Sequence, residues 1–167
     1  DVHKVKEYSF PNIRVISTSV RGQVAQRAIG FGEARSEFVM QLDDDVIVDK
    51  ECIHYLIKAM MSLYSMSAIS PIFYDRKNDN SSSALIEHYL YQNMVNPSSP
   101  IRKFLNLMIH GKKSFKGGVV TRAGMNIHFD PTGKTDDFYQ VDWLPGGCVL
   151  HRKANLIKFN FFPFSGK

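Results

Sequence analysis

The 167-residue sequence predicts an α/β protein whose sheet is mainly parallel and flanked by helices. Two observations predict this class. In the first half of the chain, β-branched or apolar runs alternate with segments of helical apolar spacing, in the order strand, helix, strand, helix, strand. The second strand also runs directly into three consecutive aspartates. Parallel strands joined by right-handed crossovers carry ligand sites at their carboxyl ends, where these aspartates lie.

The first half contains five expected elements. Strands are expected at residues 13–18, 37–42 and 68–73, and a helix is expected at residues 22–35. A second helix is expected to have Asp49 as its N-cap. This helix shows the clearest i, i+3, i+4, i+7 spacing in the chain, with apolar residues Ile53, Leu56, Ile57, Met60, Met61 and Tyr64.

The second half is expected to be a mixture of helices and short strands. Residues 75–83 are a polar loop, and helices are expected at 84–95 and 101–110. Short strands, broken by glycines, are expected at 119–121, 126–129, 138–143 and 148–151.

Composition excludes several classes of protein. Hydrophobic residues make up 44% of the chain and charged residues 22%, which excludes disorder and low complexity. No apolar run reaches 18 residues, and the N-terminus lacks the apolar run of a signal peptide. The two cysteines, Cys52 and Cys148, form neither a disulfide framework nor a metal knuckle, and they are interpreted as buried thiols in a reducing compartment.

The net charge of +5 favours an anionic partner such as a nucleotide, a phosphate or a lipid headgroup, although ordinary globular proteins also carry such a charge. Six cations lie among apolar residues within 101–122. This segment is interpreted either as a surface for an anionic membrane or a phosphorylated acceptor, or as an amphipathic helix followed by a solvated basic loop. The six histidines show no metal-ligand spacing and are expected to be structural or exposed.

The negative charges of the three adjacent aspartates 43–45 need compensation. Alternation along an extended chain sends Asp43 and Asp45 to one side and Asp44 to the other. Like charges side by side are unfavourable unless a cation or hydrogen-bond donors neutralise them. A hard divalent ion, Mg²⁺ or Mn²⁺, can do this while it binds a substrate diphosphate. The alternative is a solvated turn that caps the next helix.

Two further segments carry candidate binding residues. Arg21 and Gly22 begin the helix that contains Arg27, and a helix N-terminus of this kind suits an anion; the alternative is a solvated face. The second segment, 141–148, contains the only tryptophan and a Pro-Gly-Gly turn. Trp143 either stacks on a sugar ring or lies in the core of a tight hairpin.

Together these segments resemble the family-2 glycosyltransferases, an inverting group with the GT-A fold. The matching pattern is Arg-Gly-Gln-Val-Ala-Gln-Arg-Ala-Ile-Gly at 21–30, Ala34, and the strand ending in Asp-Asp-Asp at 38–45. The second matching segment is 141–147 with Arg152 after it. The resemblance covers about 12–65 and 138–155, and it implies a GT-A-like sheet that is incomplete.

The resemblance implies roles for particular residues. Asp43 and Asp45 are the ends of an Asp-x-Asp motif and the metal candidates, with Asp45 the direct ligand on the donor diphosphate. Asp43 lies toward the nucleoside or sugar, and Asp44 lies between them. Arg27 and Arg21 approach the donor. Residues Asp142, Trp143, Gly146 and Gly147 border the acceptor pocket. Ala28 stands where the family has an asparagine.

The resemblance also implies a single domain over 1–167, cut at both ends, with 1–75 on the donor side and 76–167 on the acceptor side. The base-binding first strand and the catalytic base are expected outside this chain, so the activity of the fragment alone stays open. The implied enzyme is a hexosyltransferase that uses Mn²⁺ or Mg²⁺. An acceptor hydroxyl displaces the nucleoside diphosphate directly.

The expected donor is linked to UDP, GDP or dTDP. The expected acceptor is a polysaccharide, a glycolipid or another glycan of the cell envelope. The expected location is the cytoplasm, with peripheral association at the inner face of the membrane. Nucleic-acid binding is not expected, because aromatic residues do not interleave with a basic sheet face. Two alternatives stay open, a non-catalytic nucleotide-sugar or carbohydrate-binding module and a Mg²⁺-dependent nucleotidyltransferase.

Overall fold

The structure is a computed structural model, and it describes residues 11–64, 68–72, 91–130 and 136–156. The chain divides into two compact units. The first unit comprises Asp1–Ile69 and Leu150–Lys167, and the second comprises Ser70–Val149. The expected loop at 75–83, and the first part of the helix expected at 84–95, lie outside the described residues.

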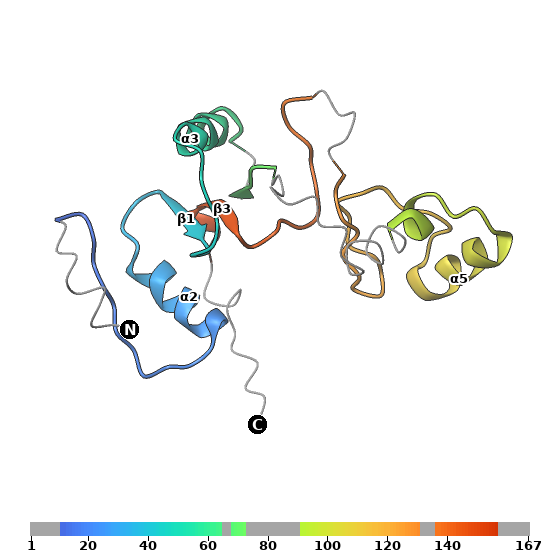
Figure 1. Ribbon diagram of the computed structural model, residues 1–167, viewed down its shortest axis with the longest axis horizontal. Coiled ribbons are helices and arrows are strands. Elements are labelled where there is room, and N and C mark those ends of the chain that lie inside the picture. The colour runs from blue at the N-terminus through green and yellow to red at the C-terminus, as the bar shows by residue number, and fades with distance from the viewer. Residues whose placement is uncertain (1–10, 65–67, 73–90, 131–135, 157–167) are drawn as a thin grey trace. The chain divides into compact units, whose positions relative to one another are not determined.

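The first unit contains a small sheet with helices (Figure 1). Its elements in chain order are α2 (Gln23–Glu33), β1 (Phe38–Leu42), α3 (Cys52–Ser62), β2 (Ala68–Ile69), β3 (Cys148–Arg152) and a 3₁₀ turn (Lys153–Asn155). Of β3, residues 150–152 belong to this unit. The strand order is β1-β3-β2, so a segment from far along the chain forms the middle strand. The strands expected near residues 37–42 and 148–151, and the helices expected near 22–35 and after Asp49, are confirmed.

The expectation of a mainly parallel sheet is wrong for the described residues. The pair β2–β3 is antiparallel, with Ala68 opposite His151 and Ile69 opposite Leu150. β2 is also shorter than expected, because Pro71 has no N–H to donate to a ladder. The described elements therefore form a mixed α/β arrangement around a three-stranded sheet.

The expectation of a first strand at residues 13–18 is also wrong. Ile13, Val15 and Ile16 are 51%, 42% and 43% exposed, and the segment belongs to no strand. Side chains hold it instead, since Arg14 Nη2 donates to the carbonyl of Glu33 at 2.9 Å and pairs with its carboxylate at 2.8 Å. A β-branched run predicts extended backbone, but a strand also needs a partner edge.

Helix α3 packs by only part of the face that its periodicity predicts, since Ile53 of that face is 45% exposed. Leu56, Ala59 and Met60 are buried, whereas Met61 and Tyr64, expected on the same face, are 59% and 85% exposed. Asp49 is not the N-cap. It forms the turn before the helix, where its carboxylate accepts from Glu51 N at 2.9 Å and its carbonyl accepts from Cys52 N at 3.0 Å. The cap residue is Glu51, two positions later than expected.

Arg152 joins three elements of the first unit. One guanidinium nitrogen pairs with the Glu37 carboxylate at 2.7 Å, and another donates to the Met60 carbonyl at 2.9 Å. The guanidinium carbon also lies 5.1 Å from the centroid of the Phe38 ring. A planar group with five donors suits such simultaneous contacts. Arg152 therefore ties β3 to the start of β1 and the end of α3.

His151, the neighbouring residue of β3, packs its ring edge-on against Phe31 of α2, with ring centroids 5.5 Å apart. Its Nε2 is buried without a hydrogen-bond partner among the described residues. Burial lowers the pKa of His151 below 6.5, because the low-dielectric surroundings penalise the charged imidazolium. The expectation that this histidine is structural fits its position in the sheet.

The second unit is built on helices and a glycine-rich turn region. Residues 91–95 are helical, and α5 (Pro100–His110) begins with Pro100 and ends at Gly111, whose φ is +83°. The helix expected at 101–110 is thus confirmed. A small core contains Met94, Phe115 and Ile127. Of the helices that the structure describes, none has the length and apolar content that a membrane span needs.

Three strands expected in this unit do not form as ladders. Residues 119–121 and 126–129 are reduced to one antiparallel bridge, Val120 with Asn126, and residues 138–143 are irregular. The reason is local. Gly118 adopts a positive φ of +82°, and its carbonyl accepts from Asp142 N at 2.7 Å, so the chain turns where a ladder would continue. Neither cysteine forms a disulfide, and Cys148 is buried while Cys52 is partly exposed.

The lowered pKa of His151 predicts a loss of stability in acid. In the unfolded chain a histidine takes up a proton near pH 6.5, whereas the folded site resists protonation until a lower pH. The free energy of unfolding that depends on His151 is therefore constant above about pH 7 and falls as the pH drops below about 6.5. Urea unfolding from pH 7.5 to 5.5 measures this.

The control for this prediction is His151→Gln, which has no charge at any pH. The difference in unfolding free energy between wild type and variant should shrink, or change sign, as the pH falls. A difference that grows in favour of the wild type on acidification contradicts the prediction.

Candidate functional site

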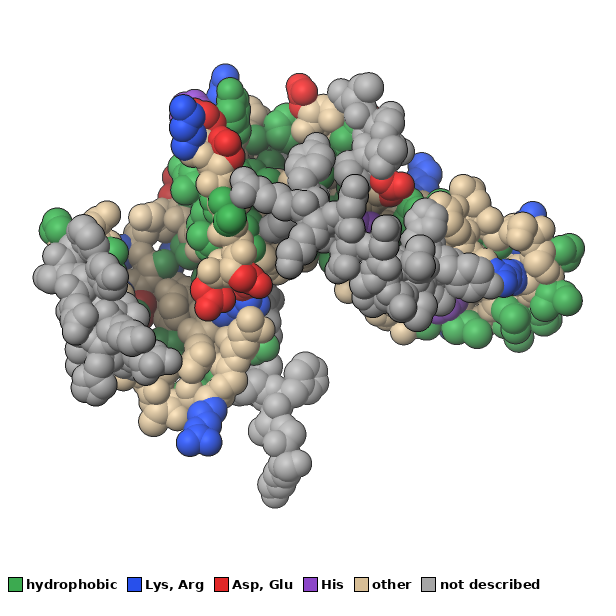
Figure 2. All heavy atoms as spheres, in the orientation of Figure 1, with side chains coloured by type: hydrophobic (Ala, Val, Ile, Leu, Met, Phe, Trp, Pro, Cys, Tyr) green, Lys and Arg blue, Asp and Glu red, His purple; other side chains and the backbone are tan. Residues whose placement is uncertain are grey.

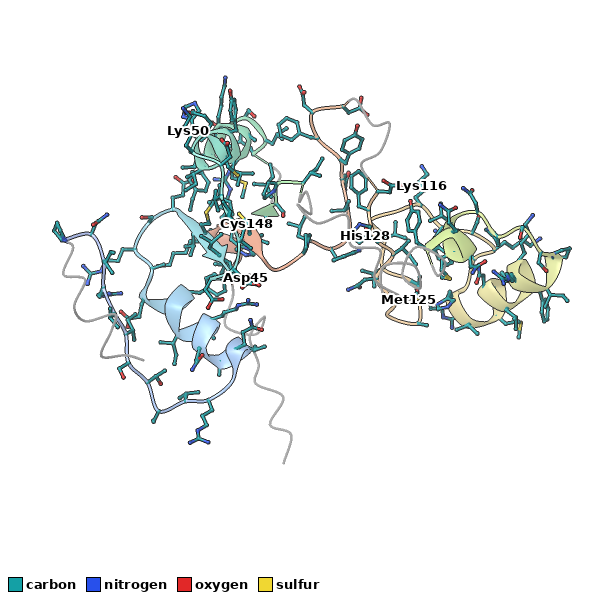
Figure 3. All side chains as sticks on the ribbon, viewed as in Figure 1. Asp45, Lys50, Lys116, Met125, His128 and Cys148 are labelled. Atoms are coloured by element: carbon teal, nitrogen blue, oxygen red, sulfur yellow. The ribbon has the colours of Figure 1, made fainter. Side chains whose placement is uncertain are left out.

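The acidic loop, residues Asp43–Asp45, follows β1 directly. Asp43 is partly exposed, and Asp44 and Asp45 are exposed. The carbonyl of Asp43 accepts a hydrogen bond from Val46 N at 3.4 Å, which turns the chain away from the strand. Figure 3 shows Asp45 just beyond the end of β1. The edge strand therefore presents three carboxylates in a short turn.

One of the three aspartates has a cationic partner. Arg27 Nη2 of α2 contacts Asp43 Oδ1 as a hydrogen-bonded ion pair, although the residues are 16 positions apart. The two side chains are 27% and 31% exposed, so water screens the pair only in part. Sequence analysis placed both residues near one ligand but did not predict their contact. The pair compensates one carboxylate and leaves two exposed.

The exposed carboxylates have the chemistry of a hard-metal site. Mg²⁺ typically uses one or two protein carboxylates and takes its other ligands from waters and substrate phosphates. Asp45 can supply such an oxygen from an open turn. Among the described residues, no group of three or more His, Cys, Asp or Glu side chains is arranged to hold an ion. The donor set fits an ion that arrives with a diphosphate.

The start of α2 offers backbone N–H groups to an anion. Gly22 precedes the helix with φ +103°, and a Cβ added there meets nothing within 4 Å. Its carbonyl accepts the first helical bond, from Gln26 N at 3.0 Å. Arg21 is exposed beside it. Of the two expected donor-side arginines, only Arg27 contacts the acidic loop within the described part of the chain.

The second candidate segment, around Trp143, belongs to the second unit. Trp143 is partly buried, and its indole Nε1 donates to the carbonyl of Ile127 at 3.1 Å. Asp142 bridges the same turn region, because its carboxylate accepts from Val120 N at 3.0 Å. The indole nitrogen and this carboxylate therefore already have structural partners. Any contact of Trp143 with a ligand would therefore use the apolar face of its ring.

The two glycines expected at the acceptor pocket lie in the turn that leads into β3. Gly146 is exposed and Gly147 is partly exposed. The glycine that positions the Trp143 segment is Gly118, which sequence analysis did not single out. Its N–H donates to Ile127 at 2.9 Å and its carbonyl accepts from Asp142. The adjacent pair Gly117-Gly118 was the signal that could have identified it.

Comparison with known proteins identifies a family. Residues 1–126 of the chain match the sequence model of glycosyl transferase family 2. This range includes the acidic loop and Arg27, and it ends before the Trp143 segment. No curated protein and no solved structure shows significant similarity to the chain.

The packing around Gly118 predicts that a single methyl group added there strongly lowers the stability of the fold. A Cβ at Gly118 lies 2.4 Å from Val141 Cγ1, and the φ of +82° disfavours any L side chain. Gly118→Ala should therefore lower the free energy of unfolding by about 2–5 kcal/mol, from backbone strain and overpacking together. Chemical denaturation measures this loss.

Gly124→Ala is the matched control. Gly124 has a similar φ of +78°, but a Cβ there meets nothing within 4 Å. Only the strain of the positive φ applies at Gly124, so the free energy of unfolding should fall by about 1–2 kcal/mol. Equal losses at the two positions contradict the proposed packing of Gly118 against Val141.

Proposed function

The chain belongs to glycosyl transferase family 2, whose members transfer a sugar from a nucleotide-sugar donor, and we propose that its acidic loop binds the donor diphosphate together with Mn²⁺ or Mg²⁺. The observation that carries this proposal is the Arg27–Asp43 pair. It holds the loop at the end of β1 by its first carboxylate and leaves Asp45 exposed. Family membership also implies the GT-A fold.

The three aspartates of the acidic loop have different proposed roles. Asp45 is the direct metal ligand, and Asp43, oriented by Arg27, lies toward the nucleoside or sugar, with Asp44 between them. Asp43 supports the metal site from the same turn. When bound, the divalent ion stabilises the negative charge that develops on the departing nucleoside diphosphate. Arg27 keeps further N–H donors, since a guanidinium has five.

Arg21 and the N-terminus of α2 complete the proposed donor side. Exposed backbone N–H groups at a helix start, with a cation beside them, favour phosphate oxygens. Gly22 supports this role because a Cβ added there would meet nothing within 4 Å, which leaves room for a ligand. The proposed donor is linked to UDP, GDP or dTDP.

The proposed acceptor side is the Trp143 segment with Gly146 and Gly147. Two hydrogen bonds within the second unit support this proposal, because they fix the orientation of the segment. The indole nitrogen bonds to Ile127, so a sugar ring can use only the apolar face of Trp143. Asp142 is fixed by Val120 N and orients this turn. A glycan or glycolipid hydroxyl is the proposed nucleophile, and no residue of this chain is assigned as the base. In this proposal the acidic loop of the first unit acts on the donor and the Trp143 segment of the second unit acts on the acceptor.

Isothermal titration of the full chain with UDP, GDP and dTDP, with and without Mn²⁺, tests the donor site. At least one nucleotide should bind, and its binding should require the metal. Asp45→Ala should weaken the metal-dependent binding by at least about 100-fold, because loss of even an outer partner of a metal site typically costs 10–100-fold in affinity.

The matched control is Glu51→Ala, which removes an exposed carboxylate of the same unit from the start of α3. It should leave nucleotide binding unchanged. Metal-dependent binding that survives Asp45→Ala would refute the role of Asp45. If the acceptor gains a nucleotidyl group rather than a sugar, the proposed transfer is wrong. If the complete protein binds a nucleotide-sugar but transfers nothing, it is a non-catalytic module.

A further inference from the structure

Helix α5 has its polar side turned inward. Asn106 is only 8% exposed, and its side-chain nitrogen donates to the carbonyls of Asn93 at 3.2 Å and Lys113 at 3.3 Å. Arg102 and His110 lie one turn before and after Asn106, so they share this face. All three line a hollow of about 270 Å³ in the second unit. The polar stripe of the helix therefore faces the protein.

The apolar side of α5 faces outward. At 3.6 residues per turn, Phe104 and Met108 are each roughly 160° from Asn106 around the helix axis. They are 59% and 68% exposed, and Ile101 beside them is 71% exposed. Figure 2 shows hydrophobic side chains gathered over α5. A surface helix of a globular protein normally has the opposite orientation, so the exposed apolar stripe is a binding surface.

The charge around the stripe identifies its partner. Residues 91–129 contain six lysines and arginines and no aspartate or glutamate. The exposed cations among them are Lys103, Lys112, Lys113, Lys116 and Arg122. An exposed apolar helix face, in a segment whose exposed charges are all positive, is complementary to a surface that is apolar inside and anionic outside.

We infer that α5 docks on an anionic lipid bilayer as an interfacial helix. Its 11 residues extend about 16 Å, roughly half the thickness of the hydrocarbon core, so the helix lies along the surface. Ile101, Phe104 and Met108 enter the boundary between headgroups and acyl chains. The exposed basic residues of the same segment contact the anionic headgroups. This inference stands on the second unit and does not depend on the proposed donor site.

Co-sedimentation of the full chain with lipid vesicles tests the inference. Two vesicles are compared, phosphatidylcholine alone and an equal mixture of phosphatidylcholine and phosphatidylglycerol. Binding to the mixture should be at least about tenfold tighter, because each basic residue near an anionic surface adds about fivefold. High salt should weaken this binding, since it screens the headgroup charge.

Two matched variants locate the surface. Met108→Glu places a carboxylate in the centre of the apolar stripe, and Met61→Glu makes the same change on α3, at a position 59% exposed. Met108→Glu should lower affinity for the anionic vesicles by about tenfold or more, and Met61→Glu should not change it. Neither variant should lower the melting temperature, because both methionines are exposed.

Several results overturn the inference. They are absence of binding to either vesicle, equal binding to both, and equal loss of binding in the two variants. A clear fall in melting temperature for Met108→Glu alone shows that protein covers the stripe. A change of oligomeric state in Met108→Glu, with vesicle binding intact, assigns the stripe to a second copy of the chain.

Discussion

The ion pair between Arg27 and Asp43 is the contact on which the donor-side geometry depends. Three adjacent carboxylates repel one another, and a strand that ends in them needs a compensating cation. Arg27 supplies one from α2 and so connects the helix to the end of β1. Because only the first carboxylate is engaged, the turn keeps Asp44 and Asp45 open to solvent. One internal salt bridge thereby connects the loop to α2 and leaves two carboxylates available for the proposed metal and diphosphate.

The sheet that carries this loop is held together from distant parts of the chain. β3 lies between β1 and β2, and Arg152 at its end contacts Glu37, Phe38 and the carbonyl of Met60. The position of the acidic loop therefore depends on residues more than a hundred positions away in sequence.

Local patterns predicted α2, α3, α5, β1 and β3, because apolar periodicity and β-branched runs act within a few positions. These patterns failed where the structure of a segment depends on a partner far away in the sequence. Residues 13–18 are β-branched, but Arg14 and Glu33 hold the segment without a strand partner. Spacing predicted that α5 is amphipathic, and could not show that Asn106 faces inward. The candidate aspartates were identified from sequence, whereas the contact of Asp43 with Arg27 needed the fold.

The most direct test of the account is a crystal structure of the protein with Mn²⁺ and the nucleoside diphosphate that binds best, with the ion located by its anomalous scattering. The expected result is Mn²⁺ held by a carboxylate oxygen of Asp45 together with the diphosphate, with the Arg27–Asp43 pair intact. An ion bound away from Asp45, or an acidic loop that binds nucleotide only after Arg27 and Asp43 separate, contradicts it.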